Sequence, residues 1–175
     1  AGSNKDIAAP RIVPKAQKRL EQLAASGEKF AMFVHLFEPH STYLKHEQFP
    51  ITERGTAGLE QKYDYEIAFT DQWLGTLLST LDSTKLSENT IVVIVSDHGE
   101  AFGTHRVAGK RMFFHGQTLY DELLRVPMIM RIPGVDARRI EQPTMLMDLG
   151  PTLLGVLGIE APASMKGRNL GPAIA

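Results

Sequence analysis

The chain has 175 residues, of which 43% are hydrophobic and 22% are charged, and its formal net charge is -1. These values are typical of one soluble globular domain and lack the basic surplus of proteins that bind nucleic acid. The chain has no cysteine, which excludes disulfides, thiolate metal sites and a cysteine nucleophile. No apolar run approaches the roughly 20 residues of a membrane span.

The first half of the chain predicts a helix, a strand and a longer helix. Residues 1–13 are polar and interrupted by proline, so we expect a surface or flexible lead-in. Pro14 suits the first turn of a helix, and Gly27 suits its C-terminal end. The apolar run over 30–37 predicts a buried strand. A helix should follow from about 59 to 81, with its leucines on one stripe.

The second half continues the alternation of strands and helices. Residues 91–95 are all β-branched and apolar, which predicts a strand buried on both faces, as in a parallel sheet. A Gly- and Lys-rich loop is expected over 101–116, followed by a short helix over 117–124. Residues 126–132 predict a third strand.

A last helix and a tail complete the chain. The helix should lie within 143–158, with Asp148 as a plausible cap, and residues 159–175 should form an extended tail. The alternation of helices and strands predicts an α/β sandwich with a mostly parallel sheet. We expect residues 1–175 to form a single domain.

Polar side chains follow two of the predicted strands. One strand runs directly into Asp97 and His98, and another is followed closely by His40. The carboxyl ends of neighbouring parallel strands meet at one edge of a sheet, where α/β proteins bind ligands. A carboxylate and a neutral imidazole are both ligands of divalent metals. Asp97 and His98 are therefore candidates for a metal site; the alternative is a strand end that only turns at Gly99.

The loop expected after this strand adds more basic side chains. It contains His105, Lys110, Arg111 and His115. A single histidine is more often a packed or solvated residue than a ligand. Four histidines gathered at strand ends and in one loop are harder to explain in that way, and they indicate a functional site.

Several stretches are specific in combination. They are SDHGE at 96–100, GTH at 103–105, FHGQTLYDELLRVP at 114–127, FEPHSTY at 37–43, YEIA at 65–68, MDLGPTLL at 147–154 and KGRNL at 166–170. Together they resemble the sulfatase family of the alkaline phosphatase superfamily, over about residues 14–171. Thr42 stands where the family's PHxPY stretch often has proline. The resemblance implies part of an alkaline-phosphatase-like three-layer αβα sandwich.

The resemblance also implies roles for individual residues. Asp97 and His98 match two metal ligands of the family. His40 matches the histidine that contacts the sulfate or phosphate group. His115 matches a position, lysine or histidine in relatives, that contacts the anion or assists the leaving oxygen.

Two further residues are candidates for the same site. His105 is a candidate for a supporting role beside it, and Lys110 is a rival of His115 for the anion contact. The implied substrate is a sulfate or phosphate ester, whose developing charge a divalent cation and cationic side chains would stabilise. A mixed oxygen and nitrogen ligand set fits calcium first, with manganese, magnesium or zinc as alternatives.

The resemblance also implies parts that this sequence lacks. The family's N-terminal half supplies an acidic pair of metal ligands and a nucleophile in a C/S/T-x-P-x-R stretch, and neither pattern occurs in residues 1–175. We therefore expect the C-terminal portion of a sulfatase-like enzyme, inactive alone, with its metal absent or poorly held. Its expected partners are the missing N-terminal half and a second copy that pairs at an exposed sheet edge.

Other functions stay open at this point. One is a phosphoglycerol or phosphoethanolamine transferase that acts on lipid, and another is a non-catalytic, sulfatase-like binding module. A third is a plain cation- or anion-binding protein. Many relatives act outside the cytoplasm, some of them tethered by N-terminal helices. We therefore expect a periplasmic or secreted location, and a full-length protein tethered to a membrane is a variant of this expectation.

Overall fold

The computed structural model describes residues 8–174, which form two compact units. One unit comprises residues 8–90 and 98–127, and the other comprises residues 91–97 and 128–174. The single domain expected over residues 1–175 stays a prediction. Within residues 8–174, no helix is both long enough and apolar enough to cross a membrane.

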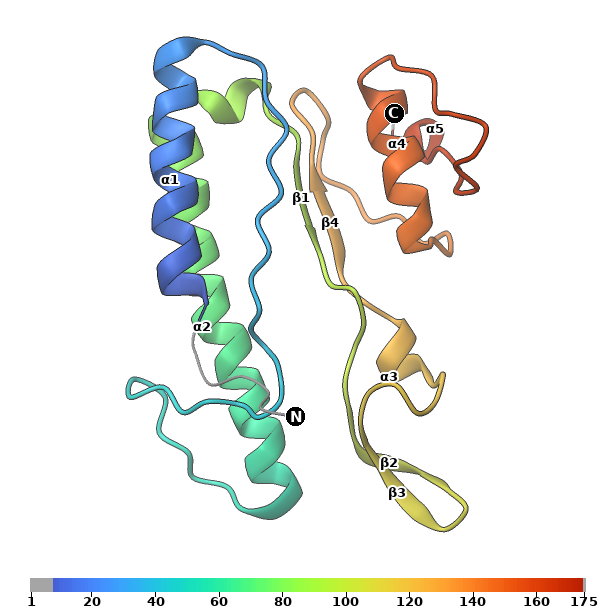
Figure 1. Cartoon of the computed structure of the whole chain (residues 1–175). Helices are drawn as coiled ribbons and strands as arrows, with labels where there is room; N and C mark the ends of the chain where they lie inside the picture. The colour runs from blue at the N-terminus through green and yellow to red at the C-terminus, as the bar shows by residue number, and fades with distance from the viewer. Residues whose placement is uncertain (1–7, 175) are drawn as a thin grey trace. The chain divides into compact units, whose positions relative to one another are not determined.

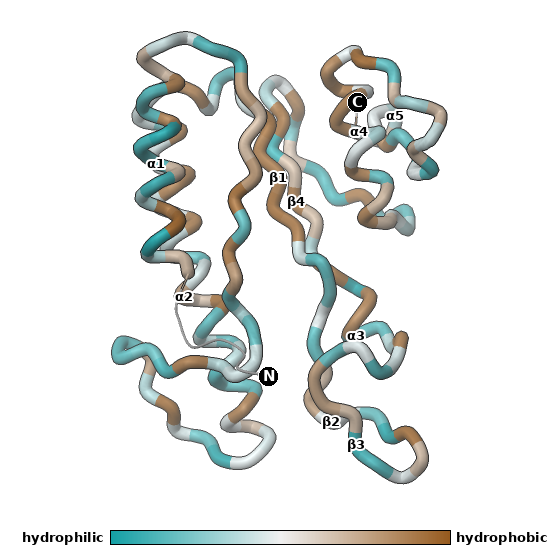
Figure 2. Tube along the Cα trace, viewed as in Figure 1, coloured by the Kyte–Doolittle hydropathy of each residue, from teal (hydrophilic) through white to brown (hydrophobic). Residues whose placement is uncertain are grey.

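Helix α1 (Ala9–Ser26) packs against helix α2 (Gly55–Ser83) in the first unit (Figure 1). Apolar and polar positions alternate along α1 at helical spacing (Figure 2). Its buried residues are Ala9, Val13, Ala16, Leu20 and Leu23. The helix ends at Gly27, whose φ of 68° is the left-handed conformation that glycine adopts most easily.

Helix α1 begins earlier than the sequence predicts. Residues 9–13, expected in a surface lead-in, form its first turns, and Ala9 is fully buried; residues 1–7 of that lead-in lie outside the described residues. The Glu38 carboxylate accepts hydrogen bonds from the backbone N–H groups of Ala8 and, at 3.2 Å, of Ala9. A carboxylate there satisfies unpaired donors and complements the helix dipole. Because Glu38 is distant in sequence, local patterns could not reveal this cap.

Helix α2 also begins before its predicted start near residue 59. The Gln61 side chain accepts hydrogen bonds from the backbone N–H groups of Thr52, at 2.8 Å, and Glu53, at 3.0 Å. These bonds fix the chain that enters the helix. Among the buried residues of α2 is a carboxylic acid, Glu66, beside apolar residues such as Phe69. A short 3-10 helix, η1 (Leu86–Asn89), follows α2.

The segment over 28–37 connects α1 to the loop before α2. Side-chain exposure over 31–37 alternates with a period of two, as in an extended strand, and Phe33 is 88% exposed. No described strand pairs with it. The predicted strand over 30–37 therefore has the side-chain pattern of a strand but no hydrogen-bonded ladder within residues 8–174.

The loop expected over 101–116 is instead a hairpin of strands β2 (Ala101–Val107) and β3 (Lys110–Phe114). Ala108 and Gly109 form its turn with φ values of 48° and 77°. Two positive φ values are characteristic of the type I′ turn, whose twist matches that of the flanking strands. The sequence hides this turn because Asn or Asp, rather than alanine, usually precedes the glycine. Helix α3 (Asp121–Leu124) lies within the predicted short helix.

The second unit contains strands β1 (Val92–Val95) and β4 (Met128–Arg131), which confirm the predicted strands over 91–95 and 126–132. They pair antiparallel, with Val93 opposite Met130. The strand ladders found in residues 8–174 are both antiparallel, so the parallel pairing expected for β1 is not present there. Val95 is 38% exposed. The expected burial of this strand on both faces is therefore not met within the unit.

The rest of the second unit is short helices and loops. They are the 3-10 helix η2 (Leu146–Asp148), helix α4 (Leu149–Val156) and helix α5 (Gly171–Ile174). The predicted helix within 143–158 is thus confirmed in two pieces. The tail expected to be extended over 159–175 ends in a helical turn.

Asp148 joins these pieces. It precedes α4 as expected, but its side chain makes no capping hydrogen bond to that helix. Its carboxylate instead accepts hydrogen bonds from the backbone N–H groups of Arg168, at 2.7 Å, and Met145, at 3.0 Å. Asp148 is fully buried. Its role is to tie the loop that contains Arg168 to η2, a contact between residues far apart in sequence.

Replacement of Asp148 by asparagine should destabilise the chain at neutral pH, because an amide nitrogen cannot accept the hydrogen bond from Met145. The backbone N–H groups of Arg168 and Met145 lower the pKa of Asp148. The ionised carboxylate therefore stabilises the folded state fully above the unfolded pKa of about 4, and this stabilisation is lost as the pH falls through the lower, folded pKa.

Denaturant unfolding of Asp148→Asn and of the unchanged chain, from neutral to strongly acidic pH, checks this linkage. The difference in unfolding free energy should shrink at the acid end. Asp136 is exposed, so Asp136→Asn removes the same charge and should cost little at any pH. A pH-independent loss in Asp148→Asn would show that the ionised carboxylate is not what stabilises the loop.

Candidate functional site

The loop that follows residues 28–37, here called the extended segment, is anchored on α2 by Glu66. One carboxylate oxygen accepts a hydrogen bond from the His40 backbone N–H at 3.0 Å, and the other accepts from Leu44 N–H at 2.7 Å. Glu66 is fully buried. Its burial raises its pKa, although the two backbone donors act in the opposite direction. The loop that carries His40 is thereby fixed to the middle of the helix.

A second carboxylate, Glu100, joins the same loop to the hairpin. The Tyr43 hydroxyl donates to one oxygen of Glu100 at 2.5 Å, and Nδ1 of His115 lies 3.0 Å from the other. The Glu100 side chain is only 5% exposed. Burial, followed by the contact with Glu100, raises the pKa of the Tyr43 phenol. The phenol therefore keeps its proton and acts as a donor to Glu100.

Three histidines gather at this point. The ring centroids of His98 and His115 are 4.0 Å apart, and those of His40 and His115 are 6.1 Å apart. These rings come from the loop after the extended segment, from the residue just after Asp97 and from the end of β3. The structure thus brings together three of the predicted site residues.

The three rings share a tautomer. Nδ1 of His98 lies 2.7 Å from the Gly99 carbonyl oxygen, and Nδ1 of His40 lies 2.6 Å from that of Ser41. A carbonyl oxygen only accepts, so Nδ1 carries the proton in both rings. In the same way, Nδ1 of His115 donates to the Glu100 carboxylate. In its neutral form each ring then has its lone pair on Nε2, the orientation that proteins impose on histidines that ligate metals or transfer protons.

His105 and Lys110 lie elsewhere on the hairpin. Nδ1 of His105 is 2.7 Å from a Glu122 carboxylate oxygen, and its ring stacks on Tyr120 with centroids 3.8 Å apart. This arrangement attaches β2 to the segment that precedes and forms α3. Lys110 is exposed and follows the hairpin turn. The structure therefore places both residues in positions other than the histidine cluster.

Gly99 was expected to allow the turn at His98 through the conformational freedom of glycine, but the structure gives another reason. Its φ is not positive; instead the chain passes very close to its Cα. A Cβ at this position would lie 2.0 Å from the Glu122 carbonyl oxygen. The Gly99 N–H also donates to the Leu123 carbonyl at 2.8 Å. This contact packs the turn after His98 against α3.

Phe114 has a strained backbone immediately before His115. Its φ is 65°, a value that is unusual for a bulky residue. Such conformations are found preferentially at functional sites, where the surrounding structure imposes them. The positive φ of Phe114 changes the direction of the chain just before His115, whose imidazole lies beside that of His98.

Asp97 is exposed and follows β1 in the other unit. Its carboxylate and the His98 imidazole are suitable donors for a divalent cation. Within residues 8–174, however, no group of three or more His, Asp or Glu side chains is arranged to bind a metal. The predicted metal site at Asp97 and His98 therefore rests on the chemistry of the two donors and stays a prediction.

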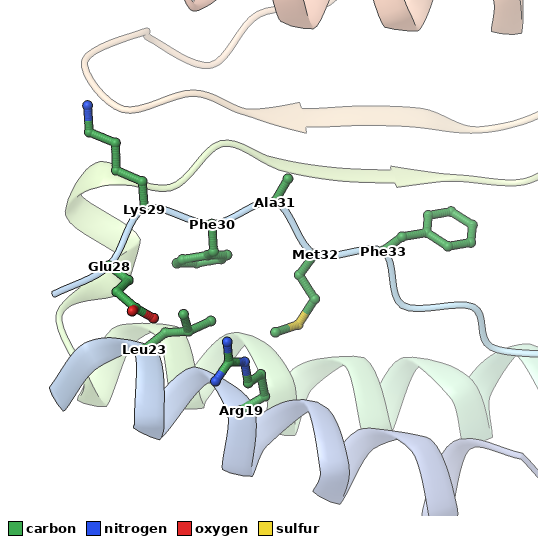
Figure 3. A pocket seen from close by; sticks show the side chains of 8 residues that line it. All are labelled: Arg19, Leu23, Glu28, Lys29, Phe30, Ala31, Met32 and Phe33. Carbon is green, nitrogen blue, oxygen red and sulfur yellow. The ribbon is translucent and has the colours of Figure 1, made fainter. Parts of the chain in front are cut away.

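A groove lies between α1 and the extended segment, away from the histidines (Figure 3). It is lined by Arg19, Leu23, Glu28, Lys29, Phe30, Ala31, Met32 and Phe33. In Figure 3, Phe30 and Met32 point toward α1, whereas Ala31 points away from it. None of the predicted site residues lines this groove.

The sulfatase family model matches residues 8–159 of the chain. The chain belongs to the sulfatase family. It is 34% identical to the ulvan-active sulfatase of Formosa agariphila over 142 residues, which are 79% of this chain and 27% of that protein. It is 31% identical to arylsulfatase K of Rattus norvegicus, over 87% of this chain and 27% of that protein. The predicted family is therefore confirmed, and it is a family of sulfuric ester hydrolases.

Solved structures confirm the fold class. The fold matches yidJ of Bacteroides fragilis with a TM-score of 0.78 and 27% identity, over 95% of this chain and 41% of that chain. It matches a structure from a study of glycosaminoglycan metabolism in Bacteroides thetaiotaomicron with the same TM-score and 24% identity. The chain thus has a partial α/β fold of the alkaline phosphatase superfamily. It spans only about 27% of the two relatives named above.

The sequence did not identify three acidic residues that organise the histidines. Glu100 lies next to the predicted metal ligands, so its position in the SDHGE stretch was a usable indication. The partners of Glu66 and Glu122 could not be found in this way, because each acts on a segment that is distant in sequence. A carboxylic acid within the apolar stripe of α2 was the one irregularity that marked Glu66.

Replacement of Gly99 by alanine should cost more than about 2 kcal/mol of unfolding free energy, because the added methyl group overlaps the Glu122 carbonyl. Gly75 on α2 provides a matched control, since a Cβ there meets nothing within 4 Å. Gly75→Ala should stabilise the chain by about 0.5–1 kcal/mol. Equal effects of the two substitutions in denaturant unfolding would contradict the close approach at Gly99.

Proposed function

We propose that this chain supplies the anion-binding and part of the metal-binding side of a sulfatase active site, which hydrolyses sulfate esters. The observation that carries the proposal is the gathering of His40, His98 and His115, each with Nδ1 donating to an oxygen. Family membership supplies the reaction class, and the histidine geometry supports the roles of individual residues.

His40 and His115 are proposed to contact the sulfate group. A sulfate ester carries its negative charge on several oxygens, and charge grows on the leaving oxygen during hydrolysis. Protonated imidazoles donate hydrogen bonds to such oxygens, and this stabilises the transition state. Glu100 orients the His115 ring, and Tyr43 in turn fixes Glu100. His115 is therefore the residue proposed to protonate the leaving oxygen.

Asp97 and His98 are proposed to hold a divalent cation, with calcium as the first candidate and manganese, magnesium or zinc as alternatives. The Nδ1–H of His98 is directed to the Gly99 carbonyl, so its neutral ring presents Nε2 as the ligating atom. When bound, such a cation polarises the sulfate oxygens as a Lewis acid. The remaining ligands and the nucleophile are proposed to come from an N-terminal half of the same enzyme.

The ester is proposed to be on a sugar. One relative is named an ulvan-active sulfatase, and a second, 38% identical over 56% of this chain, is named a delta 4,5-hexuronate-2-O-sulfatase. These names describe sulfatases of saccharides. Large saccharides do not cross membranes unaided, so we place the enzyme outside the cytoplasm, as a periplasmic or secreted protein.

The test is turnover of a sulfated sugar by the full-length protein that carries this chain. His40→Ala, His98→Ala and His115→Ala should each lower kcat/KM by roughly a hundredfold or more, because each removes a group that contacts the reacting anion or its cation. His35→Ala is the control, because His35 is exposed and stacks only with aromatic neighbours of its own segment. It should change kcat/KM by less than about twofold.

Turnover that is unchanged in the three cluster variants would end this proposal. If the three cluster variants kept full activity toward a sulfate ester and His35→Ala lost it, the active site would lie elsewhere. Tight ligand binding without any turnover, in a protein shown to be fully folded, would favour a non-catalytic binding module instead.

The extended segment is proposed to need a partner strand. Its backbone forms no ladder within residues 8–174, and its Phe33 side chain is 88% exposed. Unpaired backbone groups beside exposed apolar side chains favour strand pairing. In the full enzyme the partner is proposed to be the N-terminal half. In the isolated chain it is proposed to be a second copy, which gives a homodimer.

Phe33→Lys should weaken self-association of the isolated chain by about tenfold or more, because it places a charge in the paired edge. Analytical ultracentrifugation over a range of concentrations measures this change. Leu119→Lys is a matched control, because Leu119 is an 80% exposed apolar residue outside the segment. A chain that stays monomeric at every concentration, or equal effects of both variants, would rule out pairing at this edge.

A further inference from the structure

The β2–β3 hairpin carries a concentration of positive charge that the proposed chemistry does not use. Residues 101–120 contain Arg106, Lys110 and Arg111 but no aspartate or glutamate. All three basic side chains are exposed. The chain as a whole has a net charge of -1, so this stretch is more basic than the average of the chain.

The two arginines face each other. Arg106 and Arg111 are directly opposite across the hairpin, which places both side chains on the same face. Lys110 is opposite Val107 and therefore lies on the other face. Like charges in such a pair are destabilising. Within residues 8–174 neither arginine pairs with a carboxylate.

Among the described residues, the hydrogen bond that these guanidinium groups make is internal to the hairpin. Nη1 of Arg106 donates to the Gly109 carbonyl at 2.9 Å. This bond helps to close the turn, and it uses one of the five N–H donors of the group. It does not compensate the opposed charges. A bound anion would do so, because two guanidinium forks can share its oxygens.

The hairpin presents these arginines on a rigid element. Its tight turn has positive φ at Ala108 and Gly109. Near its base, the ring of Phe113 occupies the space over Gly103, where a Cβ would lie 2.7 Å from a ring carbon. The strands are out of simple register between Phe102 and Arg106, and such bulges occur often beside active sites. Preorganised charges lose little entropy when they bind a ligand.

The hairpin begins and ends at the proposed active site. Its terminal pair, Ala101 and Phe114, is flanked directly by Glu100 and His115. Arg111 is four residues before His115, a span of at most about 14 Å of extended chain. An anion bound between the arginines and an anion bound at His115 would therefore lie close enough to be carried by one oligosaccharide chain.

We propose that Arg106 and Arg111 form a second anion subsite, which binds a further sulfate group of a sulfated polysaccharide whose reacting sulfate lies at the histidines. The inference rests on the proposed function for the position of the reacting group. It names the substrate class as a polymer with repeated sulfate esters. A substrate with one sulfate would occupy the histidine cluster only.

Binding to the full-length protein tests the subsite without use of turnover. The probes are dextran sulfate, as a polymer with many sulfates, and glucose 6-sulfate, with one. The Arg106→Gln/Arg111→Gln double variant should bind dextran sulfate roughly five- to tenfold more weakly, with a shallower dependence on salt. Its binding of glucose 6-sulfate should not change.

The matched control is Lys15→Gln/Lys18→Gln, which removes two exposed charges from α1 in the same unit. It should weaken binding of dextran sulfate by less than about twofold. Arg111→Gln alone, which keeps the bond from Arg106 to Gly109, should show part of the loss. Unchanged thermal unfolding of these variants shows that the hairpin is intact.

Equal losses in the two double variants would overturn the subsite, because binding would then depend on total charge alone. Single-stranded DNA that binds as tightly as dextran sulfate, with the same sensitivity to Arg106 and Arg111, would also overturn it. Failure of the proposed hydrolysis is a separate result. It would appear as unchanged turnover in the histidine variants and would leave the dextran sulfate comparison intact.

Discussion

A buried carboxylate in the middle of α2 positions the candidate site. Glu66 accepts hydrogen bonds from the backbone on both sides of the loop that carries His40. Burial of an ionisable group costs free energy, as the direction of its pKa shows. Two hydrogen bonds from partly buried backbone donors offset this cost. The place of His40 beside His115 therefore depends on a residue of α2 that holds the backbone of the loop.

Glu100 extends the same logic from the loop to the hairpin. It links a phenol that keeps its proton, on Tyr43, to the imidazole of His115. Each side of this link restrains the other, because a carboxylate with two fixed partners has little freedom to rotate. The two buried acids thus connect α2, the loop and β3 in one polar network within a single unit.

The sequence predicted the parts of this protein that depend on local pattern. The apolar stripe of α1, the strand run that becomes β1 and the histidines after it follow from spacing and composition. The hairpin was missed because Ala108 replaces the usual Asn or Asp of its turn. The start of α1 was missed because its cap is Glu38, far along the chain. Pairing of β1 with β4 depends on contacts across the fold that no local pattern reports.

Three residues near the histidines break local rules. Phe114 has positive φ without being glycine, Gly99 has no space for a side chain, and Glu66 is an acid inside an apolar stripe. The positive φ of Phe114 and the burial of Glu66 each cost stability. Folded proteins retain such costs where a precise geometry is needed. Around His40, His98 and His115 these three residues fix the backbone that carries the rings, and the contacts among the rings are the reason, independent of family membership, to place the site there.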